Sequence, residues 1–214
     1  GSTIMTKMTP EEAARAHRMA KDRRRKEYED IQIQGTNNSS IVSKRSVEML
    51  YTTKVNPEMG EWFKYFVKSP KRRSPAINRG YWLRMESIRR IVLKIIQENP
   101  GKSISIVNLG CGFDPFPFQI LSEFRSKRQD SQALHFIDID YPDLVKNKKD
   151  MMIESPEIME LLGEAREDNK TNKNIVMSFK NYSLIGCNLR ELDLFNSLLE
   201  QVNIAEVTIF IAEG

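Results

Sequence analysis

The sequence predicts an α/β fold in which a parallel sheet is covered by helices. From Ser103 onward, short apolar runs alternate with stretches of helical periodicity, the pattern of repeated β-α units. A glycine motif, VNLGCGFDP, follows the first of these runs, and the second run ends in acidic residues, FIDIDYPD. Ligands of such sheets bind outside the carboxyl ends of the strands, so both motifs are expected at the ligand-binding edge.

Residues 1–34 are predicted to form a basic N-terminal arm. The stretch 9–30 begins with Thr9, a suitable N-cap, and has acids in its first turn and cations at its end, as a helix dipole favours. It has few apolar residues and therefore no face to bury. Between Arg15 and Lys26 there are seven Lys or Arg residues against one acid, a density that suits either a polyanionic partner or a solvated helix face.

Residues 35–102 are predicted to form a helical cap that covers the cofactor and substrate. A turn-rich loop, GTNNSS, precedes helical spacing from Ile41 to Leu50, and Phe63, Phe66 and Val67 suggest a second short amphipathic piece. The range from Tyr81 to Glu98 carries a broad apolar stripe, which predicts a helix that packs on the sheet.

Residues 103–214 are predicted to form the core. The expected strands are Ser105 to Leu109, Ala133 to Ile139, Ser183 to Gly186 and Val207 to Ala212. The expected helices are Phe116 to Lys127, Leu144 to Met152, Glu157 to Glu167 and Leu192 to Gln201. Asp168 to Asn174 is read as a polar insertion.

Composition and charge exclude several classes of site. The net charge is +4 with a pI near 9.0, and the apolar runs are far too short to cross a bilayer. Two cysteines and two histidines at unrelated spacings favour neither a disulfide scaffold nor a metal centre nor a Ser-His-Asp triad. With no signal-peptide core at the start, a cytoplasmic protein is expected.

The two motifs together predict a nucleoside-like cofactor. Glycines allow a tight turn and a close approach of the backbone to a ligand, and a carboxylate at the end of the next strand can accept hydrogen bonds from ribose hydroxyls. The third glycine of dinucleotide-binding loops is missing, which disfavours NAD. S-adenosylmethionine, which has no phosphate, fits better.

Five motifs in order resemble the leucine carboxyl methyltransferase family. They are INRGYWLR, NLGCGFDPFPF, IDIDYP, IGCNLREL and IFIAEG, and the similarity runs from about Gly35 to the last residue. The resemblance implies a Rossmann-like, class I S-adenosylmethionine-dependent methyltransferase fold with an N-terminal helical extension. Because the chain stops after what is taken as the fifth strand, the core is expected to be incomplete. GTNNSSIVSKRS and KRRSPAINRGYWLR are more similar to the branch of the family that modifies tRNA during wybutosine synthesis.

The resemblance also implies a set of cofactor-binding residues. A lysine and an arginine hold the methionine carboxylate in the family, and they match Lys44 and Arg84. Gly110 lies under the methionine part, and the glutamate at the end of the last strand, Glu213, approaches the amino group. The ribose and adenine sides correspond to Gly112, Asp140, Tyr141, Asn188 and Leu189, with Asn188 standing where the family often has aspartate. Taken singly, each of these residues could equally be structural; as an ordered set they favour the cofactor site.

The cations are the candidates for tRNA contacts. Between Glu61 and Arg90 there are nine Lys or Arg residues against two acids. The tRNA-binding candidates from the two basic segments are Arg23, Arg24, Arg25, Lys71, Arg72, Arg73 and Arg79. Arg79 could instead form a structural ion pair, and Tyr81 and Trp82 are read as core rather than base-stacking residues.

The implied reaction is methyl esterification of the side-chain carboxylate of the wybutosine precursor in the anticodon region of tRNA-Phe, followed by methoxycarbonylation of its amino group. An ionised carboxylate needs no general base, so no catalytic side chain is assigned and catalysis is expected to rest on positioning. Two alternatives stay open. The acceptor could be the C-terminal leucine carboxylate of a phosphatase catalytic subunit, or the chain could be a non-catalytic nucleoside-binding scaffold, since a core without its last strands is expected to be poorly active alone.

Overall fold

The computed structural model describes residues 9, 11–12, 15, 17–21, 39–127, 134–166 and 172–213. The chain divides into two units, residues 1–39 and 40–214, and each is described by itself. In the first unit Thr9 caps a helix. Its Oγ1 accepts from the Glu12 backbone N–H at 3.3 Å, and Glu12 Oε2 accepts from the Thr9 N–H at 2.8 Å. This reciprocal pair is a capping box and confirms the predicted helix start.

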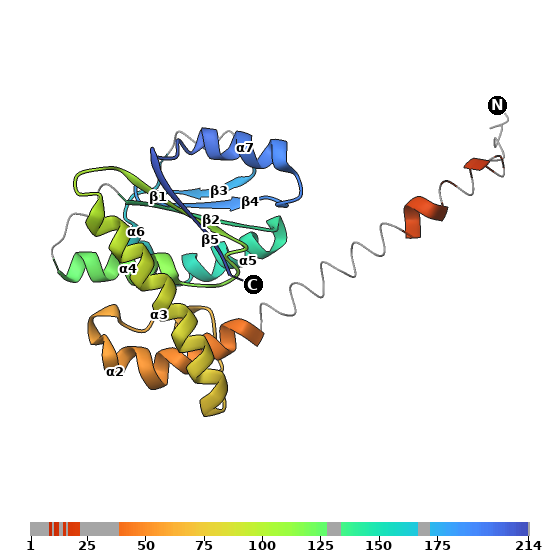
Figure 1. The fold of residues 1–214 in the computed structure, drawn as a ribbon. Helices are drawn as coiled ribbons and strands as arrows, with labels where there is room; N and C mark the ends of the chain where they lie inside the picture. Colours follow the sequence, from red (N-terminus) through yellow and green to blue (C-terminus); the bar gives the residue numbers. More distant parts are fainter. Residues whose placement is uncertain are drawn as a thin grey trace. The chain divides into compact units, whose positions relative to one another are not determined.

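The second unit is built on one five-stranded sheet (Figure 1). The strand order is β3-β4-β2-β1-β5. The strands β1, β2, β4 and β5 are parallel and β3 runs antiparallel to β4. Their bounds are β1 (Ile104–Leu109), β2 (Leu134–Asp140), β3 (Ile175–Ser178), β4 (Tyr182–Gly186) and β5 (Val207–Ala212).

Helices cover both faces of this sheet (Figure 1). On one face lie α4 (Phe116–Ser126), α5 (Pro142–Ile153) and α6 (Pro156–Leu162), and on the other lies α7 (Leu192–Gln201). Side chains alternate along a strand, so each strand contributes residues to two hydrophobic clusters, one on each face of the sheet. Ile106 and Phe136 belong to the cluster under α4 and α5, whereas Val107 and Ile137 belong to the cluster under α7. The α/β prediction is thereby confirmed.

The long helix α3 (Pro75–Glu98) leads directly into β1. Ser74 is its N-cap, with Oγ accepting from the Ile77 N–H at 3.5 Å, and Pro75 occupies the first turn. The predicted start at Tyr81 is therefore six residues too late. Proline is favoured at this position because its missing N–H is not needed in the first turn and its φ suits a helix.

The segment before α3 is helical but irregular. An α-helix over residues 39–47 continues into a π-helical turn, η1 (Glu48–Thr52), and then α2 (Thr53–Val55). Two short 3-10 turns follow, η2 (Pro57–Met59) and η3 (Phe63–Tyr65). Glu48 is fully buried, and its carboxylate accepts the backbone N–H groups of Trp62 (2.6 Å) and Phe63 (3.1 Å). This carboxylate explains how η3 begins without a capping side chain of its own.

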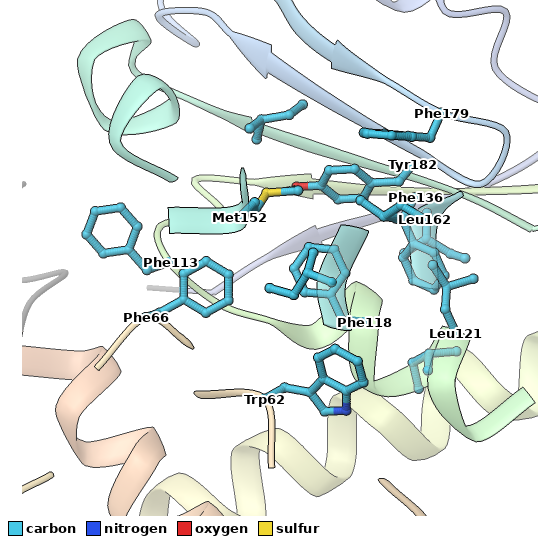
Figure 2. Packing of buried hydrophobic residues seen from close by; sticks show 14 of the residues in the cluster. Trp62, Phe66, Phe113, Phe118, Leu121, Phe136, Met152, Leu162, Phe179 and Tyr182 are labelled. Atoms are coloured by element: carbon cyan, nitrogen blue, oxygen red, sulfur yellow. The ribbon is translucent and has the colours of Figure 1, made fainter. Parts of the chain in front are cut away.

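Aromatic packing joins this segment to the sheet (Figure 2). The rings of Trp62 and Phe66 each lie 6.2 Å from the ring of Phe118 in α4, which in turn lies 5.2 Å from Tyr182 in β4. The N-terminal helices therefore share one hydrophobic core with the sheet. The 3-10 turn η3 and its neighbours are thus fixed against α4 on one face of the sheet.

Two features differ from the prediction. The strand β3 was not predicted, and the helix expected over Glu157 to Glu167 ends at Leu162. Gly163 follows with φ of 75°, a conformation that terminates a helix readily. Ala165 then forms an isolated antiparallel bridge with Phe179. None of the helices in the described residues is both long and apolar enough to cross a membrane.

Candidate cofactor-binding site

The glycine loop follows β1 at the carboxyl end of the sheet. Gly110 and Gly112 have φ of 67° and 50°, the left-handed region that disfavours side chains. The N–H groups of Gly110 and Cys111 donate to the carbonyl of Ile139 at 2.9 and 3.1 Å, which ties the loop to the end of β2. A Cβ atom at Gly110 would meet no atom within 4 Å. The space above this residue is therefore open for a ligand.

Asp140, the last residue of β2, lies directly beside this loop. Its carboxylate accepts the N–H of Gly112 at 2.8 Å and that of Tyr141 at 2.7 Å. Burial raises the pKa of Asp140 although these two hydrogen bonds oppose the shift. Each oxygen engages one donor in these bonds and has further acceptor capacity, which suits ribose hydroxyls.

The turn after β4 lies next to Asp140, because the N–H of Cys187 donates to the Asp140 carbonyl at 2.8 Å. Asn188 occupies this turn, and its Oδ1 accepts the N–H of Arg190 at 3.0 Å. Leu189 is exposed to 36%. The structure thus places Asn188 in the turn beside Asp140, with its carbonyl oxygen in a turn-forming role.

Three of the expected residues meet in one charged cluster. Lys44 is buried, and its Nζ contacts Glu213 Oε2 at 2.6 Å and Asp114 Oδ2 at 2.5 Å. Arg84 Nη1 lies 3.6 Å from Glu213 Oε1. Burial acts to lower the pKa of Lys44, but the carboxylates of Asp114 and Glu213 hold it above its usual value. Lys44 therefore remains a cation.

One atom of this cluster is left for a ligand. Glu213 Oε1 is buried and accepts no hydrogen bond from any residue that the structure describes. A buried carboxylate oxygen without a donor is costly, and an ammonium group of a ligand would satisfy it. The two cations beside it suit a ligand carboxylate, with the guanidinium able to bind in bidentate fashion. The cluster therefore fits the zwitterionic end of an amino acid.

A buried network supports the loop from below. Asp138 and Lys148 have no exposed side-chain surface, and their charged atoms lie 2.6 Å apart. Lys148 Nζ also donates to the Asp114 carbonyl at 2.9 Å, and the Tyr182 hydroxyl donates to Asp138 at 2.9 Å. Burial acts to lower the pKa of Lys148, but the charge of Asp138, its hydrogen bond to Lys148 and the neighbouring Cys111 and Asp114 together raise it. This network fixes the end of the glycine loop against α5.

The sequence analysis missed Lys148 and Asp114. A signal for Lys148 exists, because it shares its helical face with Leu144 and Met152, all three of them buried. A lysine in such an apolar stripe indicates a buried partner. Asp114 lies within the glycine motif itself. Its contact with Lys44 could not be predicted from local pattern, because the two residues are 70 positions apart in the sequence.

The described basic candidates lie on the surface before and within α3. Lys71, Arg72 and Arg79 are exposed and Arg73 is partly buried, with its N–H donating to Ser46 Oγ at 3.1 Å. Arg79 forms no ion pair with the residues that the structure describes, and both a phosphate contact and a structural ion pair stay open for it. Arg23, Arg24 and Arg25 lie outside the described residues.

The model of the leucine carboxyl methyltransferase family matches residues 13–214, nearly the whole chain. The chain belongs to this family. Its sheet and glycine loop are consistent with the Rossmann-like methyltransferase fold expected of a leucine carboxyl methyltransferase.

Three curated relatives of the chain carry the same name. The chain is 52% identical over 220 residues to "tRNA wybutosine-synthesizing protein 4" of Candida albicans, covering 99% of this chain and 31% of that protein. It is 40% identical over 210 residues to the protein of the same name from Saccharomyces cerevisiae, covering 90% of this chain and 30% of that protein. The Eremothecium gossypii protein is 42% identical over 196 residues, or 87% of this chain and 28% of its own length. The chain thus spans about a third of the length of these relatives.

Tyr81 lies beside Arg84 on α3. The Arg84 guanidinium lies 5.6 Å from the centre of the Tyr81 ring, and Tyr81 is only partly buried. Trp82 lines a pocket together with Asp114, Phe116 and Glu213. No group of three or more His, Cys, Asp or Glu side chains in the described residues could hold a metal ion.

Proposed function

We propose that the protein is an S-adenosylmethionine-dependent carboxyl methyltransferase of wybutosine biosynthesis. The observation that carries the proposal is the cluster of Lys44, Arg84 and Glu213 at the same sheet edge as the glycine loop and Asp140. Such a site offers two cations and one carboxylate to an amino-acid group, and a second carboxylate to a ribose. Membership of the leucine carboxyl methyltransferase family supports the same cofactor.

Each residue has a distinct role in this proposal. Lys44 and Arg84 bind the methionine carboxylate. Glu213 binds the ammonium group through Oε1, which accepts no hydrogen bond from the described residues and lies 3.6 Å from Arg84 Nη1. Gly110 leaves room for the methionine chain, and Gly112 holds Asp140 in place for the ribose. Tyr141, Asn188 and Leu189 form the adenine side, where the exposed Leu189 offers an apolar contact.

The reaction transfers a methyl group from sulfonium to a carboxylate oxygen. The bond between sulfur and the methyl carbon breaks, the sulfur keeps the electron pair, and an ester bond to oxygen forms. The acceptor is already ionised near neutral pH, so no side chain has to remove a proton. The residues of this chain therefore act by binding and orienting both groups in line, which can contribute several kcal/mol to lowering the barrier.

The acceptor in this proposal is the side-chain carboxylate of the wybutosine precursor in the anticodon region of tRNA-Phe, with methoxycarbonylation of its amino group as a later step. The names of the relatives support tRNA over a phosphatase tail. Lys71, Arg72 and Arg79 are exposed near the start of α3 and would neutralise backbone phosphates. Arg23, Arg24, Arg25 and Arg73 stay candidates for the same role.

The test is transfer of a labelled methyl group from S-adenosylmethionine, with tRNA-Phe carrying the precursor and the phosphatase catalytic subunit offered as competing acceptors. We expect label in the tRNA, and no label when Arg84 is replaced by alanine. Arg90→Ala is the matched control on the same helix. Arg90 is exposed and, among the residues that the structure describes, pairs with Glu86 alone, so its loss should leave transfer unchanged. Label in the phosphatase alone contradicts the tRNA proposal, and label in neither contradicts both enzymatic proposals.

A further inference from the structure

Asp114 is the part of the charged cluster to which no role has been given. It follows the glycine loop and precedes α4, and it is held at three separate atoms. Its Oδ1 accepts the N–H of Phe116 at 2.9 Å, its carbonyl accepts from Lys148, and its Oδ2 contacts Lys44 Nζ. Few residues of the site are fixed so completely.

Glu213 is held far less firmly. Only one of its oxygens is hydrogen-bonded, to Lys44, while Oε1 has the Arg84 guanidinium at 3.6 Å and accepts no hydrogen bond among the residues that the structure describes. A ligand ammonium group at Oε1 would share this carboxylate with Lys44, which contacts the other oxygen. Asp114 is held by two further contacts, from the Phe116 N–H and from Lys148, so these bonds keep it beside Lys44 when a ligand reaches Glu213. Of the two partners, Asp114 is therefore the permanent one.

We propose that Asp114 is a positioning residue that holds the ammonium group of Lys44 in place for the carboxylate of the cofactor. The proposal rests on the proposed cofactor site. Lys44 is on the N-terminal helix and the glycine loop is on the sheet, so the contact also couples the cap to the loop. Without Asp114, a long and flexible lysine side chain has to be ordered by the ligand alone, which costs binding free energy.

The proposal has a consequence for pH dependence. Lys44 is buried and faces two carboxylates, Asp114 from the glycine loop and Glu213 from the end of β5, with Arg84 of α3 beyond Glu213. Burial acts to lower the pKa of Lys44, and the two carboxylates act to raise it. Removal of one carboxylate weakens the raising effect, so the pKa of Lys44 falls. A neutral lysine no longer attracts the cofactor carboxylate, so affinity should fall as the pH rises.

The experiment measures the affinity for S-adenosylmethionine by calorimetry between pH 7 and pH 10. Asp114→Asn keeps an oxygen that accepts the Phe116 N–H but has no charge for Lys44. We expect roughly tenfold weaker binding at pH 7, the size of one charge-assisted hydrogen bond, and a further loss at alkaline pH that the unchanged protein does not show. Asp114→Ser, whose hydroxyl can also accept from Phe116, should behave in the same way if the asparagine variant fails to fold.

Glu123→Gln is the matched control. Glu123 also holds a cation, Arg89, at 2.7 Å, but it lies on α4 away from the loop. Its replacement should leave the affinity and its pH profile unchanged. Equal affinity of Asp114→Asn and the unchanged protein, or a loss that is the same at every pH, overturns the proposal. Absence of binding by the unchanged protein overturns the cofactor site itself, a separate result.

Discussion

Replacement of Lys148 by methionine should destabilise the protein more than any surface substitution. Lys148 and Asp138 are both fully buried with their charged atoms 2.6 Å apart. The substitution leaves Asp138 with only the Tyr182 hydroxyl at 2.9 Å and the Asn108 amide at 3.3 Å. Removing one partner of a buried pair typically costs about 3–5 kcal/mol, because the remaining charge is left uncompensated.

This cost is a large share of the stability of a domain, which is about 5–15 kcal/mol. Urea denaturation followed by circular dichroism should show a midpoint shifted strongly downward. Asp138→Asn in the Lys148→Met background should recover part of the loss, since the stranded charge is then gone. Lys146→Met, an exposed site on the same helix, should change the unfolding free energy by less than about 0.5 kcal/mol. A Lys148→Met variant within about 1 kcal/mol of the unchanged protein would refute the assigned network.

Three further predictions concern other parts of the molecule. Gly110→Ala should lower the free energy of unfolding by about 1–2 kcal/mol in urea denaturation, because φ is 67°. It should also weaken S-adenosylmethionine binding in calorimetry. Unchanged affinity would contradict the assignment of the open space above Gly110 as the ligand site. Burial, assisted by Arg166, lowers the pKa of His135 to about 4, so the folded protein holds this side chain in its neutral form. The contribution to stability is fully present above pH 6.5 and is lost as the pH falls towards 4. It amounts to at most about 3 kcal/mol. Replacement of His135 by glutamine should flatten the unfolding free energy over that range, and an unaltered slope counts against this assignment. Joint replacement of Lys71 and Arg72 by alanine should weaken tRNA binding and lower the salt slope by about 1 for each lost phosphate contact in filter binding, whereas an equal slope excludes them as phosphate contacts.

Much of the fold follows from local pattern in the sequence. The strand Val207–Ala212 and the helix Leu192–Gln201 have the predicted bounds, because each carries a clear period and lies between polar turns. The strand β3 was missed because Ile175–Ser178 has only four residues and is defined by its pairing with β4. The start of α3 was misplaced although Ser74 and Pro75 signal it, since the prediction rested on the apolar stripe, which begins only near Tyr81.

The site was predictable residue by residue only where a motif resembled a known family. The contact between Lys44 and Glu213 spans 169 positions, and no local pattern reports such a distance. The role of Asn188 as a turn former depends on the Arg190 N–H and likewise follows from the structure. Asp114 and Lys148 were missed for the same reason, because their partners come from other elements of the fold.

The most direct test of the account is calorimetric titration of the protein with S-adenosylmethionine, alone and with Asp140→Ala or Arg84→Ala. We predict one saturable site in the unchanged protein. Each variant should bind at least about 100-fold more weakly, since the loss of two hydrogen bonds to a charged group, or of a bidentate cation, is worth roughly 3 kcal/mol. Normal binding by Asp140→Ala, or no binding by the unchanged protein, would contradict the assignment of the cofactor to this edge of the sheet.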